Sequence, residues 1–233
     1  MTEEHLARIQ IGDDCYFTDS LAEHIRRILS GFKINRENRQ GLKHAAIAFT
    51  LVRCSAPANI GNIAHTPAHL KQAGFVLTTR AAKLSSHPGQ RAFPGGRVDP
   101  GETVEQAALR ELSEEVDLQI EPSAILGRLD DFRTRSGFVI SPVVVWVDEQ
   151  LEMTANPGEV EIIHRIPLNE LLRDDAPILE AGAASGSPVL KMPLGDDWFA
   201  APSAAIAYQF REVALLGRDT RVAHFEQPEF AWQ

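Results

Sequence analysis

The stretch GRVDPGETVEQAALRELSEEVDL, residues 96–118, determines the architecture more than any other part of the chain. Thr103 and Gln106 have the spacing of a capping box, so the sequence predicts a helix from there through about Val116. Upstream of it, closely spaced Pro-Gly pairs predict a loop that turns several times over 84–100 and has no regular structure. We therefore expect a loop followed by a short helix.

The predicted helix carries an apolar face and an acidic face side by side. At about 100° per residue, its apolar side chains form one stripe for the core: Leu109, Leu112 and Val116. Three carboxylates fall within one arc of about 100° beside that stripe: Glu111, Glu114 and Glu115. Like charges at this spacing cost about 0.2–0.5 kcal/mol per pair, and the one nearby base, Arg110, is expected to point elsewhere. A divalent cation removes the repulsion, and oxygen ligands suit Mg²⁺ or Mn²⁺, although a solvated acidic face explains the helix alone equally well.

Charge is unevenly distributed along the chain. The formal net charge of −9 argues against general binding to nucleic acid or to acidic membranes. Residues 38–98 contain eight bases and no Asp or Glu, whereas residues 96–117 contain seven acids and two bases. A basic stretch followed by an acidic one suits an anionic substrate that is bridged by metal cations.

Length and composition indicate one globular unit. The chain has 233 residues, of which 44% are hydrophobic and 24% charged, as in ordinary folded proteins. Its apolar runs are shorter than the roughly 18–20 residues that cross a bilayer, and its start lacks the features of a secretory signal, so we expect a cytoplasmic protein. Cys15 and Cys54 are expected to be ordinary free thiols.

Mixed strand and helix patterns predict an α/β (α+β) sandwich. A first helix is expected over 18–31, begun by a capping box of Ser20 and Glu23. A last helix is expected over 203–216, with Ser203 as N-cap and Gly217 as stop. Strands are expected over 44–53, 74–80, 124–129, 138–147 and 159–166, then a short helix over 168–172 and a loop over 173–202.

The spacing of one motif resembles the signature of the Nudix hydrolases, G-x5-E-x7-R-E-U-x-E-E-x-G-U, where U is aliphatic. Gly96 is followed after five residues by Glu102, and after seven more by RELSEE, residues 110–115. Asp117 stands in place of the second glycine, and because Asp tolerates left-handed backbone geometry, we expect the turn to survive. The resemblance implies a Nudix α/β/α sandwich with a mixed sheet.

The same resemblance implies roles for these residues. Glu111, Glu114 and Glu115 would bind the catalytic Mg²⁺ or Mn²⁺ ions, together with a backbone carbonyl near Gly96, while Glu102 and Arg110 would form a supporting salt bridge. The resemblance covers about residues 43–172, which we expect to be the core. Residues 1–42 would form a helical N-terminal extension, and residues 173–233 a C-terminal loop and helix packed on the core in a single structural domain.

A second motif resembles that of the coenzyme A pyrophosphatase group of this family, LLTxR(S/A)x3Rx3Gx3FPGG. The chain keeps the spacing of this motif from Val76 to Gly96, and Ser85 replaces the internal arginine. The resemblance nominates Glu159 as general base, although an exposed loop carboxylate is the plain alternative. The candidate substrate-binding residues, each of which could instead be a surface base, a turn residue or a core residue, are Arg80, Lys83, Arg91, Phe93, Arg97, Ser136 and Phe138.

The resemblance implies an enzyme that hydrolyses the diphosphate of coenzyme A or acyl-CoA to adenosine 3′,5′-bisphosphate and (acyl-)4′-phosphopantetheine. One alternative is a Nudix pyrophosphatase for ADP-ribose, NADH or another nucleoside diphosphate derivative, which the loss of arginine at Ser85 keeps open. A second is a non-catalytic Nudix ligand sensor. The expected partner is a small nucleotide-type substrate, without nucleic acid or membrane, and a homodimer is possible.

Overall fold

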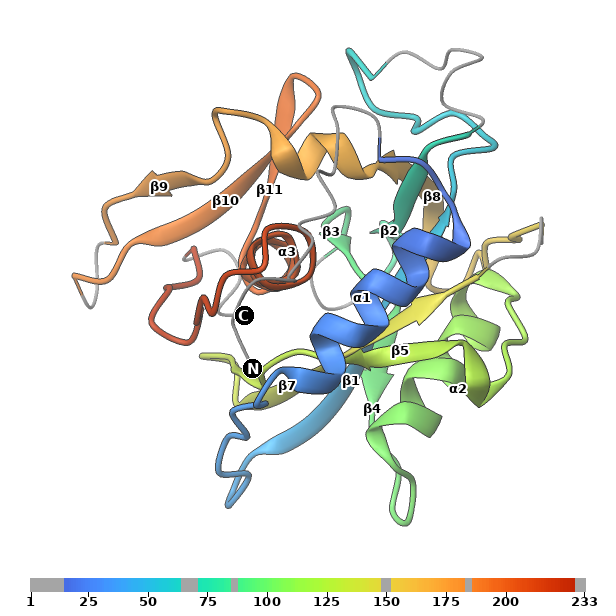
Figure 1. Cartoon of the computed structure of the whole chain (residues 1–233). Coiled ribbons are helices and arrows are strands. Elements are labelled where there is room, and N and C mark those ends of the chain that lie inside the picture. Colours follow the sequence, from blue (N-terminus) through green and yellow to red (C-terminus); the bar gives the residue numbers. More distant parts are fainter. Residues whose placement is uncertain (1–14, 64–70, 85–87, 148–151, 183–185, 229–233) are drawn as a thin grey trace, which may run out of the picture.

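The computed structural model describes residues 15–63, 71–84, 88–147, 152–182 and 186–228, and their centre is a mixed sheet (Figure 1). The described strands of this sheet follow the order β3-β2-β1-β7-β5, while β4 also pairs with β1, β6 with β7 and β8 with β2. β1 runs parallel to β7, and the other pairs are antiparallel. The strands are β1 (Lys43–Arg53), β2 (Ala73–Arg80), β3 (Arg91–Ala92), β4 (Gly95–Arg97), β5 (Ile125–Arg128), β6 (Phe132–Arg133), β7 (Phe138–Trp146) and β8 (Val160–Pro167).

Helices cover both faces of this sheet. Alternate residues of β1 point to opposite faces, so Ala46 and Ala48 pack with α2 (Val104–Val116), whereas Phe49 packs with α1 (Asp19–Gly31) and α3 (Ser203–Phe210). In Figure 1, α1 and α3 lie on one side of the strands and α2 on the other. The α/β/α sandwich predicted from the sequence is therefore confirmed.

α2 begins and ends as the sequence predicts. The Thr103 hydroxyl accepts a hydrogen bond from Gln106 N at 3.2 Å, and Gln106 Oε1 accepts one from Thr103 N at 2.9 Å, which completes the capping box. Asp117 adopts the left-handed conformation, with φ 57° and ψ 35°, at the turn where the family signature has glycine. The turn is thus retained without glycine.

α1 starts differently from the prediction. Its N-cap is Thr18, whose hydroxyl accepts a hydrogen bond from Leu21 N at 3.2 Å. Because Thr18 is extended and caps the helix, Ser20 lies within the first turn, and the predicted Ser20–Glu23 capping box was wrong.

Two short strands interrupt the predicted irregular loop over 84–100. β3 pairs with β2, and β4 pairs with β1 through Ala45, Ala46 and Ile47. A Cβ atom at Gly95 would collide with the carbonyl oxygen of Ala46, so glycine is what permits this close pairing. The many turn residues of the loop therefore shape strand edges as well as turns.

The predicted loop over 173–202 was also wrong, because three strands form there. β9 (Ile178–Glu180), β10 (Val189–Leu194) and β11 (Asp197–Ala200) make a separate antiparallel sheet in the order β11-β10-β9 (Figure 1). Every residue of β10 is buried, which stabilises this sheet despite the small and turn-prone residues around it.

The last helix also differs in detail from the prediction. The N-cap of α3 is Pro202 and makes no side-chain cap bond, so Ser203 is the first helical residue and not the cap. α3 continues into a π-helical turn, η4 (Arg211–Leu215), and the chain then turns at Gly217 with φ 64°. Two 3-10 helices complete the described elements, η2 (Pro122–Ala124) and η3 (Leu168–Leu172), the second of them predicted.

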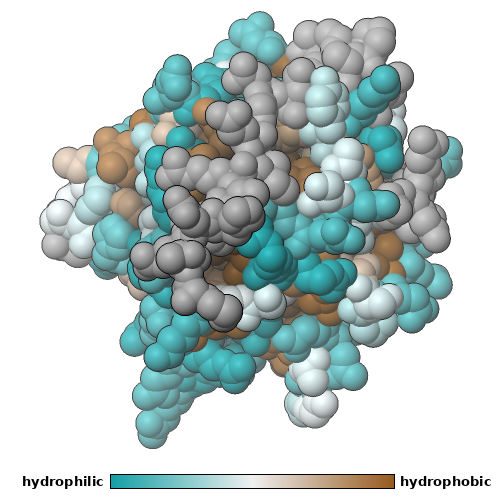
Figure 2. Space-filling model, in the orientation of Figure 1, coloured by the Kyte–Doolittle hydropathy of each residue, from teal (hydrophilic) through white to brown (hydrophobic). Residues whose placement is uncertain are grey.

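The face of the molecule seen in Figure 2 is mostly hydrophilic, with apolar residues in small areas between polar ones. The segment that joins α1 to β1 forms the hydrophilic projection at the lower left of Figures 1 and 2. None of the helices in the described residues combines the length and apolar character needed to span a bilayer. Cys15 and Cys54 are buried and are not joined in a disulfide, as predicted.

Candidate active site

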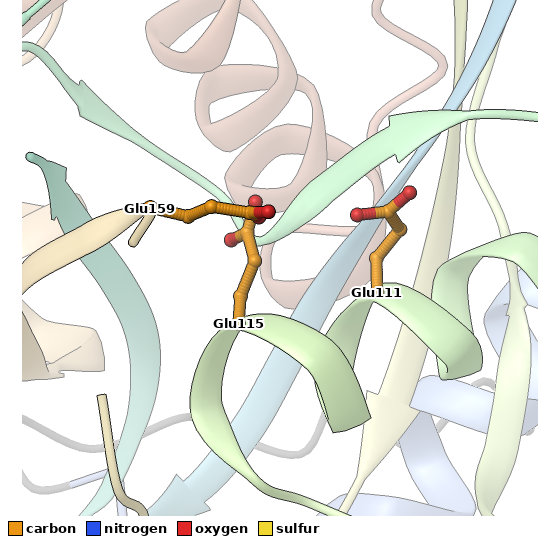
Figure 3. Close-up of side chains that lie close together, drawn as sticks. All are labelled: Glu111, Glu115 and Glu159. Carbon is orange, nitrogen blue, oxygen red and sulfur yellow. The ribbon is translucent and has the colours of Figure 1, made fainter. Parts of the chain in front are cut away.

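Three carboxylates converge beside β4 (Figure 3). Glu111 and Glu115 extend from α2, and Glu159 reaches toward them from the segment that leads into β8. One carboxylate oxygen of each lies within 4.8 Å of the others. Glu111 and Glu115 are buried, with exposed fractions of 7% and 4%, while Glu159 is exposed. Two of these side chains are therefore fixed in the protein interior and the third faces solvent.

The segment before β8 is held against the end of α2, and this contact positions Glu159. Asn156 N donates to the carbonyl oxygen of Glu115 at 3.0 Å, and Asn156 Nδ2 donates to that of Glu114 at 3.2 Å. Glu159 N in turn donates to the carbonyl oxygen of Asn156 at 2.9 Å. Asn156 thus links the helix that bears two of the carboxylates to the residue that bears the third.

Burial and the nearby negative charges make Glu111 and Glu115 hard to ionise without a cation. Burial, together with the negative charges of Glu111 and Glu159, raises the pKa of Glu115 to about 8 against the opposing effect of Arg80. Burial also raises the pKa of Glu111, although Arg110 opposes this shift. An oxygen-only set of three close carboxylates fits a hard divalent cation such as Mg²⁺ or Mn²⁺, which would remove the repulsion.

The two glycines at the start of β4 let the strand approach these carboxylates. Gly95 N–H hydrogen-bonds the Glu115 carboxylate. A Cβ atom at Gly96 would collide with the Glu111 carboxylate, so any other residue there would displace it. Gly96 is therefore close enough to the cluster for its backbone to serve the role that the sequence resemblance implies.

Arg110 joins the cluster, contrary to the expectation that it points elsewhere. Its Nε donates to Glu102 Oε1 at 3.0 Å, and its Nη1 donates to Glu111 Oε1 at 2.8 Å and to Glu114 Oε2 at 3.0 Å. Its Nη2 donates to the carbonyl oxygen of Arg97 at 2.8 Å, which ties α2 to β4. The expectation failed because the long Arg110 side chain can bend across the helix surface and does not follow the direction of its Cα–Cβ bond.

Glu102 and Arg110 form the ion pair that the sequence resemblance implies. The Arg110 hydrogen bond lowers the pKa of Glu102, so this carboxylate stays charged over a wide pH range. Glu114 lies apart from the three converging carboxylates: its side chain is 52% exposed and contacts Arg110. Its role as a metal ligand stays a prediction.

A cavity of about 750 Å³ shares Gly95 and Gly96 with the surroundings of the carboxylates, and none of the three carboxylates is among the described residues that line it. Gly95 and Gly96 form part of its wall, together with β1, β3, β7, β11 and the start of α3. Six of the seven predicted substrate-binding residues line it: Arg80, Arg91, Phe93, Arg97, Ser136 and Phe138. The seventh, Lys83, is exposed and is not part of this wall, and Ser85 lies outside the described residues. The sequence motifs thus identified one side of a ligand-sized cavity.

Two of the predicted substrate-binding residues, Phe93 and Arg91, also have structural roles. Phe93 is buried, and its ring lies 4.8 Å from that of Phe49 between centroids, so it belongs to the core while it lines the cavity. Arg91 Nη1 donates to Asp197 Oδ2 at 2.8 Å and to the carbonyl oxygen of Trp198 at 3.2 Å. Arg91 therefore fastens β3 to β11.

Sequence reasoning missed the cavity residues that come from β1 and from the C-terminal segment. Lys43 lines the cavity from β1, while Asp197 and Trp198 line it from β11. Lys43 lies in the basic stretch, so its charge was a usable signal. No local motif marks Asp197 or Trp198, because only the tertiary fold brings β11 opposite β3.

Comparison with known proteins agrees with this arrangement. The NUDIX domain family matches residues 66–184. An uncharacterised Nudix hydrolase named NudL from Photorhabdus laumondii is 40% identical over 99 residues, which are 42% of this chain and 53% of that protein. Nudix hydrolase 3 of Caenorhabditis elegans is 39% identical over 102 residues, which are 42% of each chain. The similarity thus spans about half of the length of these relatives.

Solved structures of more distant proteins show partial overlap. A MutT/nudix family protein from Enterococcus faecalis matches with a TM-score of 0.44 and 17% identity, over 77% of this chain and 57% of that one. The NUDIX domain of Shewanella oneidensis NrtR, solved with ADP ribose, matches with a TM-score of 0.39 and 18% identity, over 61% and 79% of the two chains. With a family match over half of its length and the carboxylate helix in place, this chain belongs to the NUDIX domain family.

Proposed function

We propose that this Nudix protein is a divalent-metal-dependent pyrophosphatase that hydrolyses the diphosphate of coenzyme A or acyl-CoA. The observation that carries the proposal is the meeting of Glu111, Glu115 and Glu159 beside a cavity with basic walls. Its products would be adenosine 3′,5′-bisphosphate and (acyl-)4′-phosphopantetheine. The substrate assignment rests on the likeness of residues 76–96 to the coenzyme A pyrophosphatase motif and on the cavity that several of these residues line.

Each residue has a distinct part in the proposed reaction. Glu111 and Glu115 would hold Mg²⁺ or Mn²⁺, with a backbone carbonyl near Gly96 and with Glu114 as a further ligand. The bound cation supplies charge neutralisation at the diphosphate oxygens and lowers the pKa of the attacking water. Glu159 would accept the proton of that water, a role that its exposure and its closeness to the other two carboxylates support.

The remaining residues support this chemistry. The Glu102–Arg110 pair and the Arg110 bond to the carbonyl oxygen of Arg97 fix α2 against β4, which keeps Glu111 and Glu115 beside Gly95 and Gly96. Arg80 lines the cavity and its positive charge acts on Glu115, so it is placed to meet a negatively charged phosphate near the cluster. The cavity would hold the rest of the ligand.

Product analysis tests this proposal directly. The purified chain is incubated with coenzyme A, dephospho-CoA, ADP-ribose or NADH in Mg²⁺ or Mn²⁺, and the products are separated by chromatography. We expect metal-dependent cleavage of coenzyme A at the diphosphate. Glu115→Gln should lower kcat by at least about 100-fold because it removes a charged ligand from the cluster. Glu121→Gln, which changes an exposed glutamate outside the cluster, is the matched control.

The panel also separates the alternatives. Faster hydrolysis of ADP-ribose or NADH than of coenzyme A would replace the proposed substrate and retain the enzyme class. Binding of a nucleotide with no turnover in either metal would contradict catalysis and favour a ligand sensor.

A further inference from the structure

Three cavity residues, Lys43, Arg97 and Phe138, share one face of the central sheet. Lys43 is opposite Phe138 in the β1–β7 pairing, and Ala45 is opposite Arg97 in the β1–β4 pairing. Because side chains two residues apart on a strand point to the same face, Lys43 and Ala45 share a face, and their cross-strand neighbours Phe138 and Arg97 share it too. All four residues line the cavity.

The two cations are gathered around one aromatic ring. Lys43 Nζ lies 5.3 Å from the centroid of the Phe138 ring, and Arg97 Cζ lies 5.8 Å from it. Between them in the wall is Ala45, whose small side chain leaves room above the sheet. Lys43 and Arg97 are both exposed, so their charged ends are accessible to a ligand that enters the cavity.

The charge of the cavity wall is unbalanced at this point. Its lining contains four bases, Lys43, Arg80, Arg91 and Arg97, and one acid, Asp197. Asp197 is paired with Arg91 at 2.8 Å, so it does not neutralise the other three bases. Within the described ranges, neither Lys43 nor Arg97 has an ion pair with a carboxylate. An anion that enters here would meet two available cations.

The position of this pair relative to the carboxylates defines what such an anion can be. Gly96 contacts the Glu111 carboxylate, and Arg97 is the next residue of β4. Consecutive side chains of a strand point to opposite faces, so Arg97 points away from the face on which Gly96 meets Glu111, and a group bound at Lys43 and Arg97 does not coincide with a diphosphate at the carboxylates. A ligand that occupies both places carries a diphosphate and a further anionic group.

We propose that Lys43 and Arg97 form a binding site for a phosphomonoester that the substrate carries in addition to its diphosphate. The inference rests on the proposed function and extends it to the choice among nucleoside diphosphates. A phosphomonoester has a charge of about −1.5 to −2 at neutral pH, and a guanidinium with an ammonium complements it well. Among the compounds of the panel, coenzyme A carries this group and dephospho-CoA differs by lacking it.

Binding of two product-like nucleotides tests the site without turnover. Adenosine 3′,5′-bisphosphate and AMP, which differ by one phosphomonoester, are titrated into the chain by calorimetry in EDTA. We expect the native protein to bind the bisphosphate at least about tenfold more tightly, and Lys43→Gln with Arg97→Gln to remove that preference while AMP binding is retained. Lys33→Gln, an exposed lysine outside the cavity, is the control, and Arg97→Lys should restore part of the preference.

Kinetics with coenzyme A and dephospho-CoA give an independent readout. The double variant should lose about tenfold or more in kcat/KM for coenzyme A and little for dephospho-CoA. Equal losses for both substrates, or a native protein that binds both nucleotides equally, would overturn the site. A third result is that the native protein prefers the bisphosphate and the double variant loses that preference, while the native protein hydrolyses none of the diphosphates. That result would refute the proposed function but support the phosphomonoester site.

Discussion

Glu115 has the most unusual environment of the carboxylates in the candidate site. It is nearly fully buried, it faces two other carboxylates, and its pKa is raised to about 8. The sequence identified Glu111, Glu114 and Glu115 from their helical spacing, and Glu159 from family resemblance. The sequence could not show that Arg110 hydrogen-bonds Glu114. This contact depends on the rotamer of the Arg110 side chain, which also donates to the carbonyl oxygen of Arg97.

The shift at Glu115 predicts how stability of the metal-free protein depends on pH. Its folded-state pKa lies above its unfolded value, so the folded state binds the proton more tightly, and stability is lost as pH rises from about 4.5 to about 8. Without metal, Tm should therefore fall across this window, and the fall should be smaller in Glu115→Gln. Thermal unfolding in EDTA at several pH values measures it.

Addition of Mn²⁺ provides the control for this prediction. The cation competes with the proton for the carboxylates, so it should raise Tm more at pH 8 than at pH 5. A native Tm that is flat from pH 4.5 to 8, or identical slopes in native protein and Glu115→Gln, would show that Glu115 does not titrate as described.

α2 is the element on which the site depends, and its ends are defined by local sequence. Both its capping box and its left-handed end at Asp117 were predictable, because each uses hydrogen bonds between residues close in the chain. The longer strands of the central sheet, β1, β2, β5, β7 and β8, were predictable because their runs of apolar and β-branched residues are continuous. β3, β4, β6 and β9 were not, because two- and three-residue strands form only when a partner strand is present.

The capping box predicts a measurable contribution to stability. Thr103→Ala removes the hydroxyl that accepts from Gln106 N and should reduce the free energy of unfolding by about 1 kcal/mol, within the range of 0.5–2 kcal/mol for such caps. Thr103→Ser keeps the hydroxyl and should cost much less. Urea denaturation of the three proteins measures the differences, and equal losses in the two variants would assign the effect to the methyl group.

In the whole molecule, Asp130 connects three parts of the chain that are distant in sequence. Its carboxylate accepts hydrogen bonds from Asn35 N at 2.7 Å, Gln209 Nε2 at 2.8 Å and Arg221 Nη1 at 2.8 Å. These partners precede β1, lie in α3 and follow η4, respectively. The partners of Asp130 could not be predicted from the sequence, because only the tertiary fold brings them together.

Removal of the Asp130 carboxylate should lower the stability of the whole molecule, because its hydrogen bonds join distant parts of the chain. Asp130→Ala removes the acceptor of Asn35 N and of the buried Gln209 amide, and one of the partners of Arg221, so we expect a loss of about 1–3 kcal/mol in the free energy of unfolding. Fluorescence and circular dichroism should follow one shared transition in the native protein. Asp219→Ala removes an exposed partner of the same arginine and should cost less than 1 kcal/mol. A loss below that limit in Asp130→Ala would contradict the connecting role.

The cavity is closed by β11 and α3, which the ribosome makes long after the glutamates of α2. Domains of a nascent chain gain structure as they emerge, so the acidic helix is available for folding while the opposite wall has not yet been synthesised. Premature termination before β11 would leave the wall formed by β1, β3 and β7 without its opposite side. The cavity therefore forms only after its C-terminal wall has been synthesised.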